Sequence, residues 1–183
     1  MSARQQQILD TAARLFAERG FHGVSVHDIG AACGISGPAL YKHFAGKADI
    51  LGRSLTQISE RLLREGRARA EAAADAGAAL DALVDWHVDF ALTSPELIVV
   101  QEREWRNLPQ AARKHVRDRQ LAYIDLWVSV VRRLRDDLSP DEGRAAVQAV
   151  FGLLNSTPHS ARIGTPRMRG LLARLARAAL TGP

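Results

Sequence analysis

The sequence has very little cysteine: Cys33 is the only one in 183 residues. A single cysteine cannot form an internal disulfide, and it cannot build a cysteine-based metal site. This scarcity excludes a small secreted domain that is held together by disulfides. It favours the reducing environment of the cytoplasm, which is where we expect this protein.

Long hydrophobic runs are also missing. No stretch approaches the roughly 18 uninterrupted apolar residues of a membrane-spanning helix, and residues 1–7 are polar and lack the apolar core of an export signal. We therefore expect no membrane partner and no export. Apolar residues still make up 46% of the chain, which is ample for a hydrophobic core.

Catalytic signatures are absent as well. None of the six histidines has a glutamate three residues before it, so the Glu-x-x-His pairs of a carboxylate metal centre are missing. There is no glycine-rich phosphate loop, serine elbow or cysteine nucleophile. The sequence predicts no catalytic residue, no metal and no cofactor. An enzyme and a structural interaction module remain the alternative classes.

Positive charge is present, but its distribution is not informative. The net charge of +5 and the pI near 10.1 suggest a nucleic-acid partner. Residues 1–50 contain five Lys or Arg and four Asp or Glu, so most of the excess lies elsewhere. Charge alone would not locate a DNA-binding region.

Two short helical signals joined by a tight turn lie within residues 25–47. Ser25 and Ser36 are helix N-caps, and apolar residues recur at three- and four-residue spacing after the first of them. Gly34 stands where a helix end favours positive φ, and Pro38 lies just inside the second helix. Helix, glycine turn and helix form a helix-turn-helix signature. A short helical pair inside an ordinary bundle is the alternative.

The second of these helices, predicted over residues 37–44, buries Leu40 and Phe44 and leaves small and polar residues free. Small residues permit close approach to DNA, and the polar ones offer donors to phosphates or base edges. Lys47 adds a phosphate partner at the start of the next helix. The alternative makes Tyr41 a half-buried core aromatic. The predicted DNA-contacting residues are Ser25, His27, Ser36, Gly37, Pro38, Ala39, Tyr41, Lys42, His43 and Lys47.

Residues 4–51 resemble the N-terminal domain of the tetracycline-repressor (TetR) family. The resemblance implies an all-α fold with an N-terminal three-helix DNA-binding domain and a C-terminal bundle for ligand binding and dimerisation. Position 37, often basic or polar in that family, is glycine here, which leaves the operator sequence open. Six blocks in register carry the resemblance: Ile8-Leu9-Asp10-Thr11-Ala12-Ala13, Leu15-Phe16-Ala17-Glu18-Arg19-Gly20-Phe21, Val26 to Ile29, Cys33-Gly34-Ile35-Ser36, Leu40-Tyr41-Lys42-His43-Phe44 and Lys47-Ala48-Asp49-Ile50-Leu51.

The rest of the chain also has helical periodicity, with no convincing strand and no internal repeat. We place the DNA-binding domain at residues 1–50 and the ligand-binding and dimerisation domain at residues 51–183, without a flexible linker. Residues 66–77 have the weakest periodicity and are predicted to contain a frayed helix end and a loop. The predicted helices span residues 3–19, 26–33, 37–44, 47 to about 64, 78–93, 95–105, 109–135, 140–154 and 166–180.

Aromatic and polar residues at core-compatible positions in the second half are candidates for a ligand site. For each of them, a core residue with its polar tip satisfied is the alternative. Residues 155–159 interrupt an apolar helix with polar side chains, which either bind a ligand or mark the helix end. The candidates are Trp86, His87, Phe90, Glu102, Trp105, Tyr123, Trp127, Asn155 and His159.

Dimerisation is expected because one recognition helix reads only a half-site, so a palindromic operator in double-stranded DNA needs a symmetric homodimer. The last two helices would form a four-helix bundle across the two-fold axis. The predicted interface residues are Ala146, Val150, Leu154, Leu171, Leu175 and Ala179.

These features together predict a TetR-like transcriptional regulator, a repressor that a small, largely apolar effector releases from DNA. The effector would change the angle of the helix from Lys47 to about Arg64. Acyl-coenzyme A thioesters and drug-like molecules are the two ligand classes considered. The ligand, the operator sequence and the target genes do not follow from the sequence.

Overall fold

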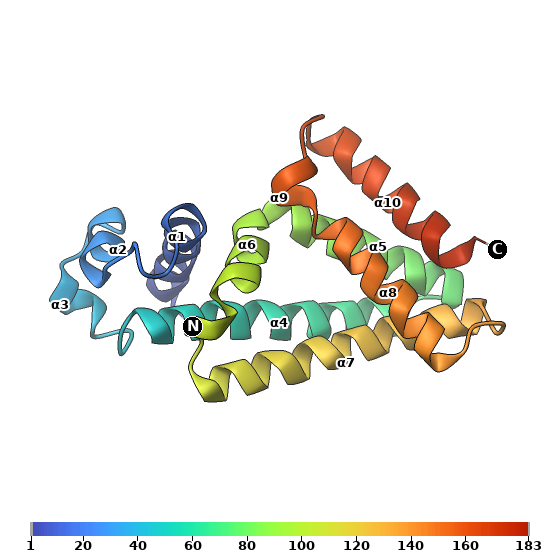
Figure 1. The fold of residues 1–183 in the computed structure, drawn as a ribbon, viewed down its shortest axis with the longest axis horizontal. Helices are drawn as coiled ribbons and strands as arrows, with labels where there is room; N and C mark the ends of the chain where they lie inside the picture. The colour runs from blue at the N-terminus through green and yellow to red at the C-terminus, as the bar shows by residue number, and fades with distance from the viewer. Residues whose placement is uncertain (1, 183) are drawn as a thin grey trace. The chain divides into compact units, whose positions relative to one another are not determined.

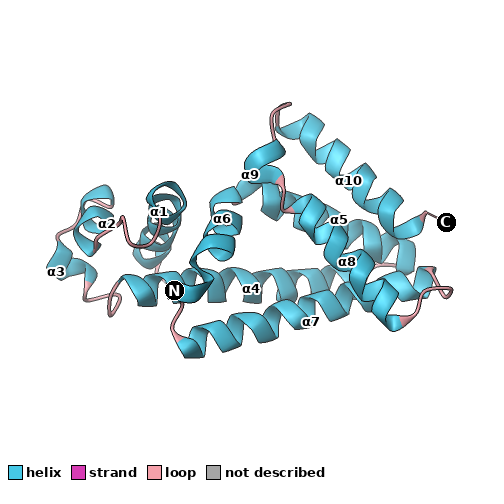
Figure 2. Ribbon diagram, viewed as in Figure 1, coloured by secondary structure: helices cyan, strands magenta, loops and turns pink. Residues whose placement is uncertain are grey.

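The computed structural model describes residues 2–182, which form helices and loops without a strand (Figures 1 and 2). The predicted all-α fold is confirmed. The elements are α1 (Ala3–Arg19), α2 (Val26–Ala32), α3 (Gly37–Leu40), α4 (Lys47–Ala72), α5 (Ala76–Thr93), α6 (Pro95–Glu104), the 3-10 helix η1 (Trp105–Asn107), α7 (Gln110–Leu134), α8 (Pro140–Leu154), α9 (Thr157–Ser160) and α10 (Thr165–Thr181).

The chain divides into two compact units. The first comprises the residues up to Ser59 together with Glu96–Arg117, and the second comprises Glu60–Pro95 and the residues from Asp118 onward. The division differs from the predicted boundary at residue 50, because α6 and η1 join the N-terminal helices. Side chains of α6 hydrogen-bond to backbone groups at the end of α1 and just after it, which explains this assignment.

In the first unit, α1 begins and ends as its sequence predicts. The Ser2 hydroxyl and the Gln5 side chain each accept the other residue's backbone N–H, forming a capping box. The helix ends at Gly20, whose φ of +73° favours glycine. One face of α1 is buried, and α2 packs against both α1 and α3.

The recognition helix is shorter than predicted. α3 ends at Leu40 and the chain continues to Phe44 as turns, in which the N–H groups of His43 and Phe44 both bond to the Leu40 carbonyl, at 2.9 and 3.1 Å. Leu40 and Phe44 are buried, as predicted. Tyr41 is 58% exposed, so it is not a half-buried core aromatic.

Helix α4 is longer than predicted. It continues to Ala72, and α5 starts at Ala76, so residues 66–77 are mainly helical rather than loop. Alanine and arginine have high helix propensity, and Arg69 bonds both the carbonyl and the carboxylate of Glu65, at 3.1 and 2.9 Å. Gly66 lies in this extension, and a Cβ there would lie 2.7 Å from Cε2 of Tyr123.

The second unit has one hydrophobic core, formed by α4 beyond residue 60, α5, α7 beyond residue 118, α8 and α10. Trp127 is its largest fully buried side chain. Three ion pairs join α10 to α5: Arg177 binds Asp81 and Asp85, and Arg169 binds Asp89 at 2.6 Å. Because these pairs are exposed, burial of apolar surface is the larger contribution to stability.

Within residues 2–182, no helix is long and apolar enough to span a bilayer.

Candidate functional site

The start of α2 is fixed by a reciprocal cap. The Ser25 hydroxyl accepts the Asp28 N–H at 3.1 Å, and the Asp28 carboxylate accepts the Ser25 hydroxyl and N–H at 2.5 and 2.8 Å. The bonds from Ser25 hold the pKa of the Asp28 carboxyl below its usual value. Both N-caps predicted in this region, Ser25 and Ser36, are confirmed.

The turn between α2 and α3 is tight. Gly34 has a φ of +67°, as predicted from its position. A Cβ on Gly30 would lie only 2.9 Å from the Ile35 carbonyl oxygen, so this position also requires glycine. The two glycines bring the end of α2 and the start of α3 close together.

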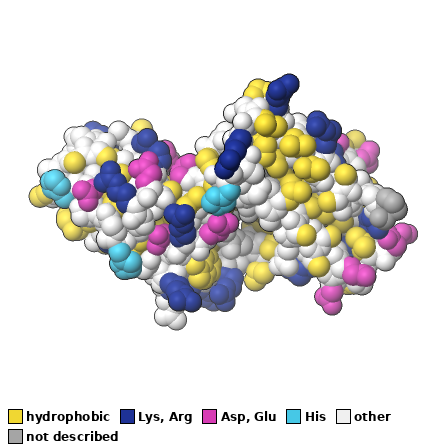
Figure 3. Space-filling view, turned by 45° about the horizontal axis from the view of Figure 1, so that its top comes forward, with side chains coloured by type: hydrophobic (Ala, Val, Ile, Leu, Met, Phe, Trp, Pro, Cys, Tyr) yellow, Lys and Arg dark blue, Asp and Glu magenta, His cyan; other side chains and the backbone are white. Residues whose placement is uncertain are grey.

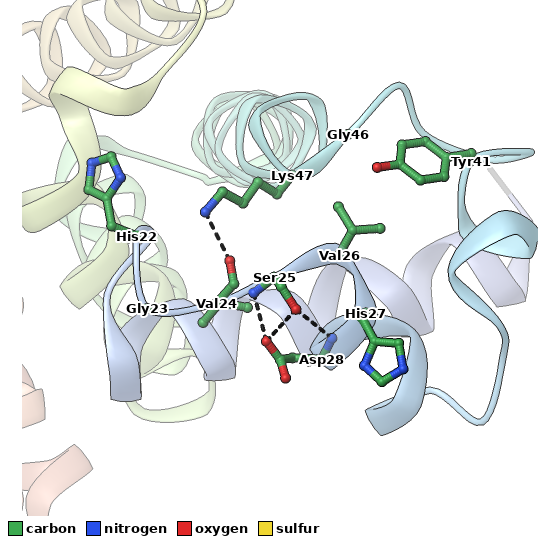
Figure 4. A pocket seen from close by; sticks show the side chains of 10 residues that line it. All are labelled: His22, Gly23, Val24, Ser25, Val26, His27, Asp28, Tyr41, Gly46 and Lys47. Atoms are coloured by element: carbon green, nitrogen blue, oxygen red, sulfur yellow. Dashed lines mark hydrogen bonds between the residues drawn. The ribbon is translucent and has the colours of Figure 1, made fainter.

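A groove of about 660 Å³ lies beside α2 (Figure 4). Tyr41 is at one end, with its hydroxyl directed back over the groove, and His22 is at the other. Four of the predicted DNA-contacting residues line it: Ser25, His27, Tyr41 and Lys47.

The other predicted DNA-contacting residues lie at or next to α3. Pro38 and Lys42 are exposed, and Ala39 and His43 are half-buried. A Cβ on Gly37 would meet nothing within 4 Å, so the surface beside it is open. This face of α3 therefore remains available for a DNA groove.

Lys47 has a role that the sequence did not predict. Its ammonium donates to the carbonyls of Phe21 and Val24, at 2.8 and 2.9 Å, and lies 4.4 Å from the centre of the Phe21 ring. An ammonium has three donors. Two of them hold the turn before α2, which leaves one N–H for a phosphate.

A cluster of aromatic rings in the second unit contains most of the predicted ligand residues. The imidazole of His87 stacks with Phe151 and Tyr123, at centroid distances of 4.6 and 5.8 Å, and meets Phe90 and Trp127 edge-on, at 5.8 and 5.9 Å. We call these five residues, together with Asn155, the ring cluster. Asn155 accepts a hydrogen bond from His87 Nε2 at 3.1 Å when that nitrogen carries the proton.

Three polar atoms of the ring cluster are buried without a hydrogen bond in the described part of the chain: His87 Nδ1, the Tyr123 hydroxyl and Trp127 Nε1. Burial lowers the pKa of His87 to about 4, although the bond to Asn155 opposes the shift. Burial also raises the pKa of the Tyr123 hydroxyl. The cluster is therefore neutral at pH 7; in this tautomer His87 Nδ1 is an unused acceptor, Trp127 Nε1 is an unused donor, and the Tyr123 hydroxyl can act as either.

The remaining ligand candidates lie outside the ring cluster. The Trp86 indole N–H donates to the Leu62 carbonyl at 3.2 Å, and the Arg69 guanidinium covers the ring at 4.4 Å. His159 is exposed on α9. These two residues are better explained as a packing residue and a surface residue.

Glu102 and Trp105 belong to the first unit. Glu102 is exposed, and Trp105 is half-buried with the Arg117 guanidinium 5.8 Å from its ring centre. Phe151 was not predicted as a site residue. Its position four residues before Asn155, on the same face of α8, is the signal that would have identified it.

The predicted dimer residues separate into two groups. Val150 and Leu154 are 2% and 0% exposed, because they pack into the core of their own unit and so cannot meet a partner. Leu175 is 44% exposed. Ala146 and Leu171 are half-buried, and Ala179 is exposed. Apolar side chains gather on the face of the second unit that carries α8 and α10 (Figure 3).

Another groove of the second unit, about 510 Å³ in volume, runs between α4 and α7. Arg64, Arg67 and Arg119 line it, together with Glu60 and Glu71. Its guanidinium groups are suited to phosphate or carboxylate groups of a ligand.

Two sequence profiles match the chain. Residues 8–53 match the profile described as "Bacterial regulatory proteins, tetR family", and residues 73–159 match "Tetracyclin repressor-like, C-terminal domain". The HTH-type transcriptional repressor KstR2 of Rhodococcus jostii (strain RHA1) is 30% identical over 131 residues. That match covers 71% of this chain and 64% of the relative, a little under two thirds of its length.

Solved structures are similar over nearly the whole chain. A TetR-family transcriptional regulator from Bordetella parapertussis 12822 matches with a TM-score of 0.89 and 24% identity, covering 100% of this chain and 96% of that one. AibR in complex with isovaleryl coenzyme A and operator DNA matches with a TM-score of 0.76 and 19% identity, covering 94% and 97%. At these identities the likeness concerns the fold alone.

Burial of His87 predicts a pH-dependent stability. Its pKa of about 4 in the folded chain lies below the usual 6.5, so between these values the unfolded chain binds a proton that the folded chain excludes. The contribution of His87 to the free energy of unfolding is fully present above pH 6.5. It is lost as the pH falls toward 4, and the total loss is roughly 3 kcal/mol. Urea unfolding at pH 7.5, 6 and 5 measures this contribution as the difference in the free energy of unfolding between wild type and His87→Phe.

The control for this experiment is His159→Phe, which changes an exposed histidine and should keep the wild-type pH profile. Parallel profiles for wild type and His87→Phe would show that His87 is not held neutral by burial.

Proposed function

This chain belongs to the TetR family of bacterial regulatory proteins, and we propose that it is a homodimeric repressor which a small, largely apolar molecule releases from operator DNA. The observation that carries the proposal is the exposed face of α3 beside a groove lined by Ser25, His27, Tyr41 and Lys47. A DNA-binding regulator needs such a face, because base edges are read by an element that enters the major groove.

In this proposal, α3 enters the major groove and the groove beside α2 takes the phosphate backbone. Gly37 and Ala39 let the helix approach the base edges closely, and Lys42 is exposed for a phosphate or a base. Tyr41 and the remaining N–H of Lys47 would bind phosphate oxygens. Phosphate contacts position the protein, and the few side chains of α3 supply the sequence preference.

Replacing Tyr41 tests the DNA interface. Because the side chain is 58% exposed, Tyr41→Ala should leave the fold intact. We expect it to weaken binding by about 1.5–3 kcal/mol, because its hydroxyl is proposed to donate to a charged phosphate oxygen. Gel shift at several salt concentrations measures the effect, on a duplex that the wild-type protein has enriched from a random pool, called here the selected duplex.

The matched control for Tyr41→Ala is Leu121→Ala, which shortens a 45% exposed side chain in the second unit and should bind DNA like wild type. Unchanged affinity of Tyr41→Ala at every salt concentration, with a wild-type circular-dichroism spectrum, would remove α3 and its flanking turn from the DNA interface.

Dimerisation follows from the same recognition logic. A palindromic operator presents two half-sites about one DNA turn apart, so two copies of α3 must be related by a two-fold axis. The apolar face on α8 and α10 is our candidate for the contact between protomers, because Leu171 and Leu175 remain accessible there. Leu175→Glu would place a charge in that contact and should give monomers in light scattering.

Leu121→Glu is the matched control for Leu175→Glu, because Leu121 has the same exposure but lies on α7. It should stay dimeric. An intact dimer for Leu175→Glu, or monomers for both variants, would contradict an interface on α10.

The ligand is proposed to bind at the ring cluster. Its unpaired atoms offer hydrogen bonds to a neutral polar group, and its rings offer apolar contact. Tyr123 also contacts Gly66 of α4, the helix that begins at Lys47, so a ligand that displaces Tyr123 acts directly on that helix. A hundredfold loss of DNA affinity needs roughly 2.7 kcal/mol of coupling between the two sites.

Acyl-coenzyme A thioesters and drug-like molecules are the two ligand classes proposed for this site. AibR binds isovaleryl coenzyme A, and the arginines between α4 and α7 would suit the phosphates of such a thioester. A drug-like molecule would need the ring cluster alone. Arg67→Ala therefore separates the classes, since it should weaken only a phosphorylated ligand.

A screen of acyl-coenzyme A thioesters, hydrophobic drugs and aromatic acids tests the switch. We expect an active compound to raise thermal stability, quench Trp127 and release the selected duplex. Tyr123→Phe, which removes only an unpaired hydroxyl, should blunt that response without changing DNA affinity; His159→Ala should respond normally. If no compound of the three classes shifts stability or frees DNA, the ring cluster is a solid core.

A further inference from the structure

A buried carboxylate connects α6 with the turn that follows α1. Glu104, at the end of α6, is 6% exposed. Its Oε1 accepts the backbone N–H of Phe21 at 3.0 Å, and its Oε2 accepts the side-chain N–H of Asn107 at 2.7 Å. Burying a carboxylate is costly unless hydrogen bonds replace its hydration. Here one of those bonds joins residues 83 positions apart in the sequence.

Phe21 is bound at its other end by Lys47. The carbonyl oxygen of Phe21 accepts the ammonium at 2.8 Å, and the ammonium also lies over the Phe21 ring. A carboxylate therefore holds the N–H of this residue, and an ammonium holds its carbonyl. Both bonds are charge-assisted, so they are stronger than neutral hydrogen bonds. Glu104 and Lys47 therefore bind the same residue, one at its N–H and the other at its carbonyl.

The turn that Phe21 begins forms one side of the groove in Figure 4. His22, Gly23, Val24 and Ser25 follow it directly, and all four line that groove. The turn is tightly wound, since a Cβ on Gly23 would lie 2.4 Å from the carbonyl oxygen of Arg19. Bonds from Glu104 and Lys47 hold Phe21 and Val24 from outside the turn.

We infer that Glu104 is a positioning residue for DNA binding: by holding Phe21, it keeps Lys47 and this side of the groove in the arrangement that the DNA backbone requires. The inference rests on the proposed DNA interface. Glu104 itself touches no DNA and acts through Phe21. Removing its side chain leaves the Phe21 N–H buried without an acceptor and frees the carbonyl that orients Lys47.

The experiment compares three variants of the full chain with wild type on the selected duplex, by fluorescence anisotropy at several salt concentrations. Glu104→Ala should lower affinity by about tenfold or more and reduce the salt slope by about one, because Lys47 is no longer placed on a phosphate. Glu104→Gln should bind within about twofold of wild type, because its amide oxygen can still accept the Phe21 N–H. Glu102→Ala removes the same charge from an exposed position of α6 and should be neutral.

A double-mutant cycle separates positioning from a general loss of stability. Lys47→Met removes the ammonium but keeps an apolar chain over Phe21. If Glu104 acts through Lys47, Glu104→Ala should add little to the loss already caused by Lys47→Met, and the salt slope should not fall further. Additive losses, or a full loss of affinity at an unchanged salt slope, would overturn the inference.

If Glu104→Ala does not fold, Glu104→Leu takes its place in the cycle, since it fills a similar volume but offers no acceptor to the Phe21 N–H; additive losses with Lys47→Met would again overturn the inference. If wild type enriches no duplex from the random pool, the proposed interface falls together with the inference. If wild type and Glu102→Ala bind and Glu104→Ala binds equally well, only the positioning role is overturned.

Discussion

The first unit depends on how Phe21 is held. This residue follows α1 directly, yet its backbone partners come from α6 and α4, through Glu104 and Lys47. Its ring packs on Phe16 of α1 at a centroid distance of 5.4 Å. Three helices therefore meet at one residue that lies outside the recognition helix. The position of α2 follows from this meeting point, because α2 starts only a few residues later.

Local signals predicted most of the fold. Caps at Ser25 and Ser36, and positive φ at Gly34, follow from chemistry within a few residues, and all three are present. The end of α4 was missed because the prediction relied on apolar periodicity, which is weak there, although helix propensity is high. The grouping of α6 with the first unit depends on bonds between distant residues, which sequence spacing does not encode.

The site was less predictable than the fold. Glu102 was singled out, whereas Glu104 is the buried acid; the apolar residues four positions earlier, Ile98 and Val100, are both buried and so do not distinguish the two acids. Val150 and Leu154 were assigned to an interface because amphipathic spacing marks a buried face without saying whether the same chain or another buries it. The ring cluster combines α5, α7 and α8, and only the folded chain brings its unpaired polar atoms together.

Because Gly66 has no side chain, the ring of Tyr123 can pack directly on the backbone of α4. A Cβ at position 66 would lie 2.7 Å from Cε2 of Tyr123 and 3.3 Å from Cδ2 of Leu83, so glycine leaves the space that both side chains occupy. Glycine inside a helix costs about 1 kcal/mol relative to alanine, so this contact lowers local helix stability. One methyl group would separate the helix from the ring. In related chains, positions 66 and 123 should therefore change together, with a larger residue at 66 accompanied by a smaller one at 123.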